Sequence, residues 1–371
     1  MRVVVAGGAG DVGSNAVADL VESDGVESVV IADRDITAAA KLAEGLSGRG
    51  ATVEALEVDA NDHDQLVAAF SDCDVVASAL GPFFRFEPLL AAAALAAGSD
   101  YVSVCDEWEP AGQVLDQFHQ PAVERGVTVL TGMGVSPGIT NLVIARLINE
   151  FDRADSADVY VYQPLDAGGG EAVLRHMLHI MSGYVYAWRG GEDAMIAACS
   201  ESREVEFATA GSLNTWNMGH SEPRTLPHYF PALDEVGFYM GFGSGSRLLV
   251  EAARWGVFSV GPLRELSLWL LQLAEGLFPA NEPVPGELRI DVTGEKDGEP
   301  CTLGMFAEGT MGGSTGASLS VAAQMLVRGE QHSGPGAWAP EGCLDASAFV
   351  GHMRSRGLVA WRDLARTVPF E

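Results

Sequence analysis

The first thirty-three residues constrain the fold of this 371-residue chain more than any other stretch. A short apolar run, Arg2–Ala6, leads into the glycine-rich segment GGAGDVG at residues 7–13, and small or apolar residues then recur at helical spacing. A second apolar run ends at Asp33, twenty residues beyond Gly13. A strand, a glycine turn, a helix, a strand and an acidic residue in this order are the signature of a dinucleotide-binding βαβ unit.

The glycines of this turn have separate physical roles in such a unit. Gly8 permits the tight turn, Gly10 lets the backbone approach a pyrophosphate, and Gly13 lets the helix pack closely on the strand. The helix N-terminus presents N–H groups and the positive end of its dipole to the phosphates. A glycine turn without a ligand is the alternative. The cofactor-binding residues expected in the turn are Gly8, Ala9, Gly10, Asp11, Val12 and Gly13.

Composition excludes several classes of protein. The chain carries 51 acidic and 22 basic side chains, a formal net charge of −29, whereas nucleic-acid binding requires a basic surface. No run of eighteen uncharged apolar residues occurs and the N-terminus lacks a basic signal segment, so we expect a soluble, cytoplasmic protein that spans no membrane. Five cysteines without CxxC spacing indicate neither a disulfide framework nor a zinc site, and we expect no bound metal.

Strand-like and helix-like segments alternate up to Leu130. Strands are expected at residues 2–6, 29–33, 52–58, 75–80, 101–104 and 127–130, with helices at 12–21, 37–46, 62–70, 87–97 and 111–124. This alternation predicts an α/β protein with a doubly wound parallel sheet, the Rossmann arrangement. Ligands of such sheets bind outside the carboxyl ends of the strands, so the residues that follow each strand form the candidate site.

The pattern changes after Leu130, and we expect three parts. The Rossmann dinucleotide-binding domain covers residues 1–131, and residues 314–371 carry closing helices, at 314–328 and 345–356, that pack back on it. Between them a mixed α+β domain serves substrate binding and dimerisation. This second domain covers residues 132–313, with helices expected at 139–151, 172–183 and 262–278 and strands at 158–163, 203–209, 288–293 and 302–308.

Several short motifs converge on one protein family. They are GGAGDVG at 7–13, ALGPF at 79–83, GVSPGITN at 134–141, HSEP at 220–223 with TLP at 225–227, Thr315-Gly316, and WAPEG at 338–342. With these motifs the chain resembles the saccharopine dehydrogenase-like family along nearly its whole length. The resemblance is closest to the short two-domain members, such as lysine 6-dehydrogenase, saccharopine reductase and carboxynorspermidine synthase.

The resemblance implies a Rossmann domain completed by C-terminal helices, and a second domain that contributes to substrate binding and to a homodimer. It also implies hydride transfer between NAD(P) and a carbon–nitrogen bond of an amino acid or an imine. By resemblance, Gly81-Pro82 flanks the nicotinamide ribose, and Pro137-Gly138 with Thr140-Asn141 approaches the nicotinamide. The cofactor-binding residues implied in these loops are Ala79, Leu80, Gly81, Pro82, Pro137, Gly138 and Asn141.

Three charged residues near the expected adenosine bear on the choice of cofactor. Asp33 can accept hydrogen bonds from the ribose hydroxyls, which favours NAD over NADP because a 2′-phosphate would meet its carboxylate. Arg34 opposes this preference, since a guanidinium can pair with the same phosphate. We therefore expect NAD or NADP, with a preference for NAD. Asp59 lies beside the adenine or, alternatively, caps the helix that follows it.

Candidate catalytic residues follow the fifth expected strand, and a further candidate lies in a later loop. An amine substrate requires a carboxylate that holds its ammonium group and a residue that exchanges its proton. Asp106 and Glu107 are candidates for these tasks, with capping or first-turn roles on the next helix as the alternative. Cys105 can approach the nicotinamide, or can serve packing alone. His220, in a proline-bounded loop with Glu222, can exchange a proton or hold the loop by hydrogen bonds.

Two further pairs of residues are weaker candidates. His176 and His179 lie three residues apart on an expected helix, a spacing that suits a metal, but no third ligand lies nearby in the sequence. Arg175 and Arg224 can pair with a substrate carboxylate.

The two lysines of the chain exclude one related class of enzyme. Short-chain dehydrogenases also open with a glycine-rich βαβ unit, but they use a Tyr-x-x-x-Lys pair. Neither Lys41 nor Lys296 has a tyrosine four residues before it. A lysine base or a Schiff-base lysine is therefore not expected, and proton transfer falls to another side chain or to water.

A long apolar stretch at residues 257–278 bears on oligomeric state. Arg264, Glu265 and Glu275 interrupt it, so it does not span a bilayer. It forms a core helix or, because so broadly apolar a helix must be covered on most sides, a dimer interface. We predict a homodimer.

Together these observations predict an NAD(P)-dependent oxidoreductase acting on a C–N bond of an amino acid or an amino-acid-derived imine. Its partner is a small amino-acid-like molecule, with neither nucleic acid nor membrane. One alternative is a member of the same family that reduces a C=O or C=C bond of an unrelated substrate. Another is an NAD(H)-binding sensor without turnover.

Overall fold

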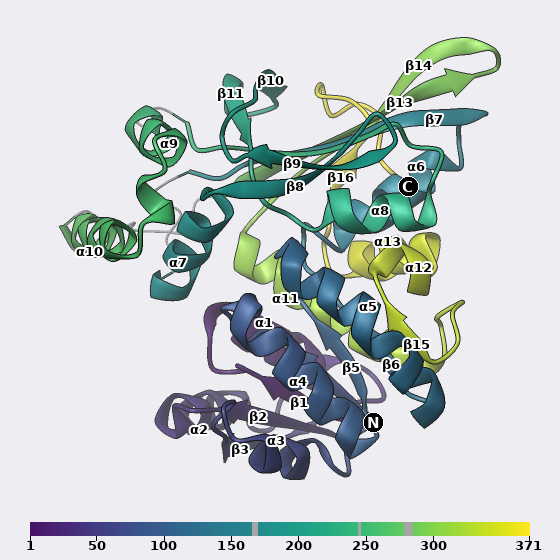
Figure 1. The fold of residues 1–371 in the computed structure, drawn as a ribbon. Coiled ribbons are helices and arrows are strands. Elements are labelled where there is room, and N and C mark those ends of the chain that lie inside the picture. Colours follow the sequence, from purple (N-terminus) through teal and green to yellow (C-terminus); the bar gives the residue numbers. More distant parts are fainter. Residues whose placement is uncertain (165–169, 244–245, 278–284) are drawn as a thin grey trace. The chain divides into compact units, whose positions relative to one another are not determined.

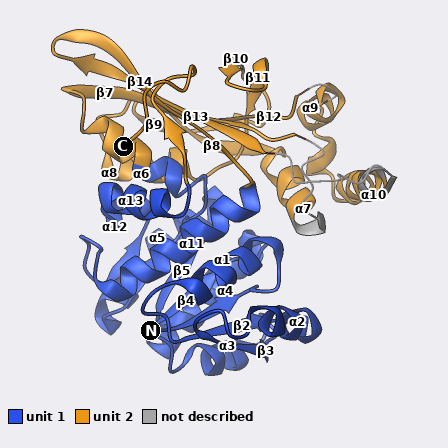
Figure 2. Cartoon of the chain, turned by 180° about the vertical axis from the view of Figure 1, so that it is seen from behind, with its two compact units in different colours: residues 1–142, 311–357 blue, residues 143–310, 358–371 orange. Residues whose placement is uncertain are grey.

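The chain forms two compact units (Figures 1 and 2). The fold is that of a computed structural model, which describes residues 1–164, 170–243, 246–277 and 285–371. Unit 1 comprises residues 1–142 and 311–357, and unit 2 comprises residues 143–310 and 358–371. Each unit therefore contains segments that are far apart in the sequence, and each is described by itself.

Unit 1 contains a seven-stranded parallel sheet in the order β15-β6-β5-β4-β1-β2-β3. All six predicted strands are present, because most are short apolar runs closed by a turn and β3 alternates apolar with polar residues. The seventh, β15, was missed because three residues, Gly-Ala-Trp, carry no periodic signal. The strands are β1 (Arg2–Ala6), β2 (Ser28–Asp33), β3 (Thr52–Glu57), β4 (Val75–Ser78), β5 (Asp100–Ser103), β6 (Thr128–Leu130) and β15 (Gly336–Trp338).

Helices connect these strands and cover the sheet. Apolar side chains of the strands form one buried cluster with those of α3, α4 and α5. Helices α1 and α11 lie side by side (Figure 1), and a Cβ at Gly316 would come within 2.6 Å of the Asn15 Cβ. The helices of unit 1 are α1 (Asp11–Glu22), α2 (Ile36–Leu46), α3 (His63–Phe70), α4 (Phe83–Ala97), α5 (Trp108–Arg125), α11 (Met311–Arg328), α12 (Pro340–Cys343) and α13 (Ala346–Ser355).

The limits of these helices follow from local chemistry. The side chains of Asp35, Asp62 and Asp345 cap α2, α3 and α13 by accepting a hydrogen bond from a first-turn N–H group. Gly98 and Gly126 end α4 and α5 in the left-handed conformation, with φ of 79° and 70°. The predicted α/β class, a Rossmann sheet completed by a C-terminal helix, is confirmed.

Unit 2 is built on a mixed sheet in the order β10-β11-β12-β7-β13-β14-β16, with β8 and β9 attached beside β12. The pair β7 and β12 is parallel, whereas β7 with β13 and β13 with β14 are antiparallel. The strands are β7 (Arg153–Tyr162), β8 (Tyr184–Arg189), β9 (Glu192–Ala197), β10 (Ser202–Phe207), β11 (Gly211–Asn217), β12 (Glu235–Gly241), β13 (Gly286–Lys296), β14 (Glu299–Gly309) and β16 (Ala360–Trp361).

The predictions for this second, mixed α+β domain were incomplete. The four expected strands are present as β7, β10, β13 and β14, but β8, β9, β11 and β12 were missed. The expected helices are present, and the predicted end of the third, residue 278, lies outside the described residues. The helices are α6 (Ile139–Ile148), which leads from unit 1 into unit 2, α7 (Gly170–Ile180), α8 (Glu222–Tyr229), α9 (Arg247–Arg254) and α10 (Gly261–Leu277), with a 3-10 turn at Val257–Ser259.

The C-terminal segment divides between the units. We expected all of residues 314–371 to pack on the Rossmann domain, but residues 358–371 cluster with unit 2. Among the contacts that hold them there, β16 pairs with β14, and Arg362 donates to Glu150 at 2.6 and 3.2 Å. Within the described parts of the chain, every helix is too short or too polar to cross a lipid bilayer.

Candidate dinucleotide and substrate site

The glycine turn between β1 and α1 has a backbone that side chains would disturb. Gly7 has φ of +73°, and a Cβ at Gly13 would lie 2.2 Å from the Gly7 carbonyl oxygen. Gly10 is the N-cap of α1 and offers no side chain that could occupy the helix terminus. The turn therefore presents bare backbone at the start of a helix, which is the arrangement that accommodates a pyrophosphate.

Asp33, at the end of β2, is joined to this turn by its carboxylate. Its Oδ2 accepts a hydrogen bond from the Ala9 N–H group at 3.1 Å, and its Oδ1 accepts one from Asp35 at 3.0 Å. A carboxylate has further acceptor positions, so these bonds leave it able to accept from a ribose hydroxyl. Arg34 follows it on the exposed surface.

Asp59 lies on the exposed surface after β3, and its surroundings test one of its two predicted roles, the capping of the next helix. Hydrogen bonds from the backbone and side chain of Asn61 lower the pKa of its carboxyl. The side chain that caps α3 is that of Asp62, so the helix-capping alternative for Asp59 is wrong. Arg85 donates to the Asn61 side chain at 2.6 Å, and the charges of Arg34 and Arg85 favour the ionised Asp59.

The loops that follow β1 and β4 lie against each other. A Cβ at Gly7 would meet the Leu80 Cα at 3.0 Å, and the Ala79 N–H group donates to the Ala6 carbonyl at 2.9 Å. The Gly81-Pro82 peptide bond is cis, and Pro82 is the N-cap of α4. The segment from Ala79 to Pro82, expected to flank the nicotinamide ribose, thus borders the glycine turn.

The segment after β6 is held by two buried polar side chains. Asn141 is fully buried, accepts a hydrogen bond from the Gly138 N–H group at 3.3 Å, and donates to Glu341 at 2.9 Å. The Ser136-Pro137 bond is cis, and Gly138 has φ of +118°. Asn141 therefore shapes the loop in which Pro137 and Gly138 were predicted to contact the cofactor. Glu341 was not predicted as part of this site, although its WAPEG motif was noted.

The Cys105-Asp106-Glu107 segment follows β5, and two of its side chains make contacts inside unit 1. Burial, reinforced by neighbouring carboxylates, raises the pKa of Cys105 well above its ordinary value, so the thiol stays protonated. Glu107 is the N-cap of α5, but its carboxylate accepts from Phe84 N–H, in the first turn of α4, at 2.5 Å. It therefore stabilises the start of α4 instead of its own helix. Asp106 is half-buried.

Sequence reasoning missed the most deeply buried carboxyl group near these loops. Glu87 in α4 is fully buried and accepts hydrogen bonds from Tyr101, Ser103 and Thr131. Burial raises the pKa of its carboxyl, while the three hydroxyl groups oppose that shift. In the sequence Glu87 is only a common helix-forming residue in an alanine-rich helix, which carries no signal of this role.

His220 and Glu222 lie in unit 2, where β11 leads into α8. The His220 Nδ1 is 2.5 Å from a Glu222 carboxylate oxygen, and both side chains are buried. The imidazole stacks on Phe238 of β12, with ring centroids 3.8 Å apart. This contact holds the ring plane, and the carboxylate faces the Nδ1 side of the imidazole.

The weaker candidates of unit 2 also have contacts. Arg175 forms an ion pair with Glu265 at 2.9 Å, and the Arg224 guanidinium lies 5.7 Å from the Tyr186 ring centroid. His176 lies with His179 on α7, and among the residues that the structure describes no three His, Cys, Asp or Glu side chains are grouped to hold a metal.

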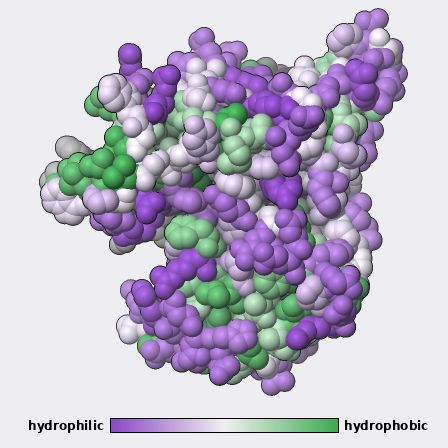
Figure 3. Space-filling view, viewed as in Figure 1, coloured by the Kyte–Doolittle hydropathy of each residue, from purple (hydrophilic) through white to green (hydrophobic). Residues whose placement is uncertain are grey.

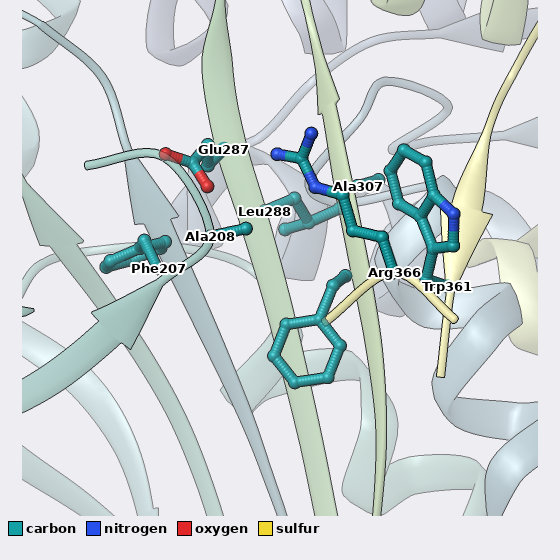
Figure 4. A pocket seen from close by; sticks show the side chains of 8 residues that line it. Phe207, Ala208, Glu287, Leu288, Ala307, Trp361 and Arg366 are labelled. Atoms are coloured by element: carbon teal, nitrogen blue, oxygen red, sulfur yellow. The ribbon is translucent and has the colours of Figure 1, made fainter. Parts of the chain in front are cut away.

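One small cavity in unit 2 is not a substrate site. It measures about 10 Å³ and lies among β13, β14 and the C-terminal segment (Figure 4), where Arg366 and Trp361 border it beside Glu287. A volume of this size holds at most one water molecule.

The parallel sheet, its glycine turn and the loops around it define a dinucleotide-binding protein of the Rossmann class with a mixed-sheet second unit. Residues 3–130 match the family described as saccharopine dehydrogenase NADP binding domain. Residues 3–130 are therefore similar to the NADP-binding domain of saccharopine dehydrogenases, as the motifs of the first domain predicted.

Relatives with curated names match only part of the chain. Carboxynorspermidine synthase of Vibrio alginolyticus is 28% identical over 260 residues, which cover 64% of this chain and 61% of that protein. A putative trans-acting enoyl reductase of Mycobacterium tuberculosis is 27% identical over 184 residues, which cover 48% of this chain and 44% of that protein. The matches thus span less than two thirds of either relative.

A solved structure shares the fold over almost the whole chain. Apo saccharopine dehydrogenase (L-Glu forming) from Saccharomyces cerevisiae matches with a TM-score of 0.72, covering 97% of this chain and 99% of its own at 16% identity. This likeness shows a common fold.

Proposed function

We propose that the protein is an NAD(P)-dependent oxidoreductase that transfers hydride at a carbon–nitrogen bond of an amino acid or of an imine formed from one. The observation that carries the proposal is the set of contacting loops at the carboxyl ends of β1, β4, β5 and β6. The glycine turn contacts Leu80, and a Cβ at Gly132 would come 3.0 Å from Pro137 and 3.5 Å from the Cys105 carbonyl. The names of two relatives, a carboxynorspermidine synthase and a saccharopine dehydrogenase, support amino-acid chemistry.

The residues of unit 1 fit a dinucleotide. At Gly13 the start of α1 packs so closely on the turn that a Cβ would meet the Gly7 carbonyl oxygen at 2.2 Å, and the α1 N-terminus offers N–H groups to the phosphates. When bound, the nicotinamide supplies or accepts the hydride. Pro137 and Gly138, held by Asn141, would limit the position of its ring and exclude water from it.

His220 is our proposed proton carrier. The Glu222 carboxylate lies against His220 Nδ1 and would orient the imidazole that exchanges the substrate proton. Asp106, half-buried after β5, would hold a substrate ammonium group by charge. Cys105 and Glu107, the other two predicted catalytic residues, would pack beneath the site and hold α4, as their contacts indicate.

The cofactor we propose is NAD(P), with NAD preferred. Asp33 borders the glycine turn, where its carboxylate would repel a 2′-phosphate. Arg34 and the NADP binding described for the matching family favour the opposite choice. Titration of the protein with NADH and NADPH decides between them, and NADPH binding about tenfold more tightly, or 1.4 kcal/mol, would overturn the preference.

Activity is tested by following absorbance at 340 nm with NADH and NADPH across a panel of oxoacids with amines, and with NAD and NADP across amino acids. We expect turnover with at least one C–N pair. His220→Asn should lower kcat by 10²-fold or more, on the order of general acid–base catalysis, and should leave NADH affinity unchanged. Nucleotide binding without turnover across the whole panel would favour a sensor.

A second candidate function is reduction of a C=C or C=O bond. It is favoured by the relative named a putative trans-acting enoyl reductase, which matches 48% of this chain. The same glycine turn and cofactor loops would serve either reaction. Oxidation of NADH or NADPH with an enoyl or carbonyl compound, and none with the imine panel, would select this alternative.

We also propose a homodimer that buries the apolar surface of α10. Leu266, Trp269 and Leu270 are 51%, 56% and 51% exposed, whereas Leu268 on the other side of the helix is buried. Two further apolar side chains, Leu248 in α9 and Trp255 directly after it, are also exposed. Figure 3 shows hydrophobic surface, coloured green, at this part of unit 2. Contiguous apolar surface of this kind is characteristic of an interface.

A further inference from the structure

A buried cluster of one carboxyl and three hydroxyl groups underlies the loops of unit 1. Glu87 Oε1 accepts hydrogen bonds from the Ser103 hydroxyl at 2.6 Å and the Thr131 hydroxyl at 2.9 Å, and its Oε2 accepts one from Tyr101 at 2.8 Å. All four side chains are at most 1% exposed. The cluster therefore joins α4, β5 and the residue that follows β6.

Each member of the cluster belongs to a segment that leads into the proposed cofactor site. Glu87 lies one turn into α4, the helix that begins directly after the cis Gly81-Pro82 bond. The Ser103 hydroxyl accepts a hydrogen bond from Cys105 N–H at 3.4 Å, and the Ser103 carbonyl accepts one from Gly132 N–H at 3.0 Å. Thr131 opens the segment that ends at Pro137 and Gly138.

Glu107 reinforces the same connection from the end of β5. Its carboxylate holds Phe84 N–H in the first turn of α4, three residues before Glu87. The start of α4 is thus fixed by two buried carboxyl groups, one from its own second turn and one from the loop after β5. A shift of Glu87 would move the loop before α4 and the loop after β6 together.

We propose that Glu87 is a positioning residue for the nicotinamide half of the dinucleotide: by binding Tyr101, Ser103 and Thr131 it holds the loops containing Pro82 and Pro137 in register. This inference rests on the proposed function, because it assigns the nicotinamide to these loops. It does not involve the glycine turn, which lies at the other half of the cofactor. The proposal therefore concerns the binding of the nicotinamide half of the cofactor and not that of the adenosine half.

The test compares NADH with ADP, which lacks both the nicotinamide and the ribose attached to it. Glu87→Gln keeps the size of the side chain but replaces one hydrogen-bond acceptor by a donor. We expect it to weaken NADH binding about tenfold and to leave ADP binding within about twofold of the wild type, by calorimetric titration. Equal affinities of wild type and variant for NADH would overturn the proposal, and so would equal losses for both ligands.

A matched control is available in β5, the strand that contains Tyr101 and Ser103. Asp100 is a partly buried carboxyl at the opposite end of β5, where it accepts from Thr128 N–H at 2.7 Å. Asp100→Asn should change the ratio of NADH affinity to ADP affinity by less than about twofold. If Glu87→Gln does not fold, Tyr101→Phe, which removes one hydrogen-bond donor to Glu87, takes its place. We expect it to change the same affinity ratio in the same direction but by less. An unchanged ratio would contradict the proposal. Failure of the wild type to bind NADH or NADPH would instead refute the proposed function.

Discussion

At the scale of single residues, Gly13 is a position where the structure leaves no space for a side chain. Its substitution by alanine would place a Cβ 2.2 Å from the Gly7 carbonyl oxygen, so the turn must open or α1 must move. Overpacking of this kind typically costs about 1–3 kcal/mol, and the displaced backbone would no longer face the phosphates. We expect Gly13→Ala to weaken NADH binding at least about tenfold in a fluorescence titration.

The control for this prediction is another helical glycine of the same unit. Gly45 in α2 is exposed, and a Cβ there would meet no atom within 4 Å. Gly45→Ala should leave NADH affinity unchanged and stabilise its helix by up to about 1 kcal/mol, since alanine is the better helix former. Equal NADH affinities for the two variants would contradict the assignment of the turn.

Lys296 gives a residue-scale test of the expectation that no lysine takes part in catalysis. It lies at the end of β13, and its ammonium is 3.7 Å from Glu150 in a partly exposed ion pair. Such pairs contribute about 0–1 kcal/mol to stability. Lys296→Ala should therefore keep kcat within about twofold in the 340 nm assay and change stability by no more than this amount. A thousandfold loss of kcat would assign the lysine a role in the reaction.

The site residues that could be predicted from the sequence differ from those that could not in how far along the chain their contacts lie. Gly13 and Asp33 belong to a local pattern, so their spacing alone indicated the turn. The partners of Glu87 are 14, 16 and 44 residues away, and Asn141 lies 200 residues from Glu341. Only the packed fold brings such groups together, and no periodicity in the sequence records their contact.

At the scale of elements, the two units differed in how well their strands could be predicted. The central strands of unit 1 are buried on both faces, as in β1 and β4, and appear in the sequence as short continuous apolar runs. In unit 2, β9 and β11 alternate exposed and partly buried residues and include charged or polar side chains. Their strand character depends on the neighbouring strands with which they pair, which the sequence does not identify.

The elements joined by Glu87 should show a characteristic dependence of stability on pH. Burial raises the pKa of its carboxyl above the ordinary value of 4.5, so the folded state binds this proton more tightly than the unfolded state. Its contribution to stability is therefore complete below pH 4.5 and is lost as pH rises toward the folded pKa. Glutamine does not titrate, so the Tm of the wild type should fall relative to that of Glu87→Gln as pH rises above 4.5. Parallel Tm curves in scanning calorimetry would contradict this prediction.

At the scale of the whole molecule, the net charge opposes the association of two copies, whereas the exposed apolar surface favours it. Two copies of a chain with a net charge of −29 repel each other at long range, and salt screens this repulsion with a Debye length of about 8 Å at physiological ionic strength. Burial of apolar side chains is far less sensitive to salt at these concentrations. Association through α10 should therefore strengthen as ionic strength rises, whereas association through ion pairs would weaken.

The proposed dimer can be tested by placing a charge in its apolar surface. Trp269 is 56% exposed on α10, and in Trp269→Glu each copy would bring a carboxylate into the interface, where burying an unpaired charge is costly. We expect light scattering at micromolar concentration to give a dimer mass for the wild type, most completely at high salt, and a monomer mass for the variant. Val123→Glu, the same kind of change at a 43% exposed residue of α5, should remain dimeric. A monomeric wild type, or a dimeric Trp269→Glu variant, would show that α10 does not form the interface.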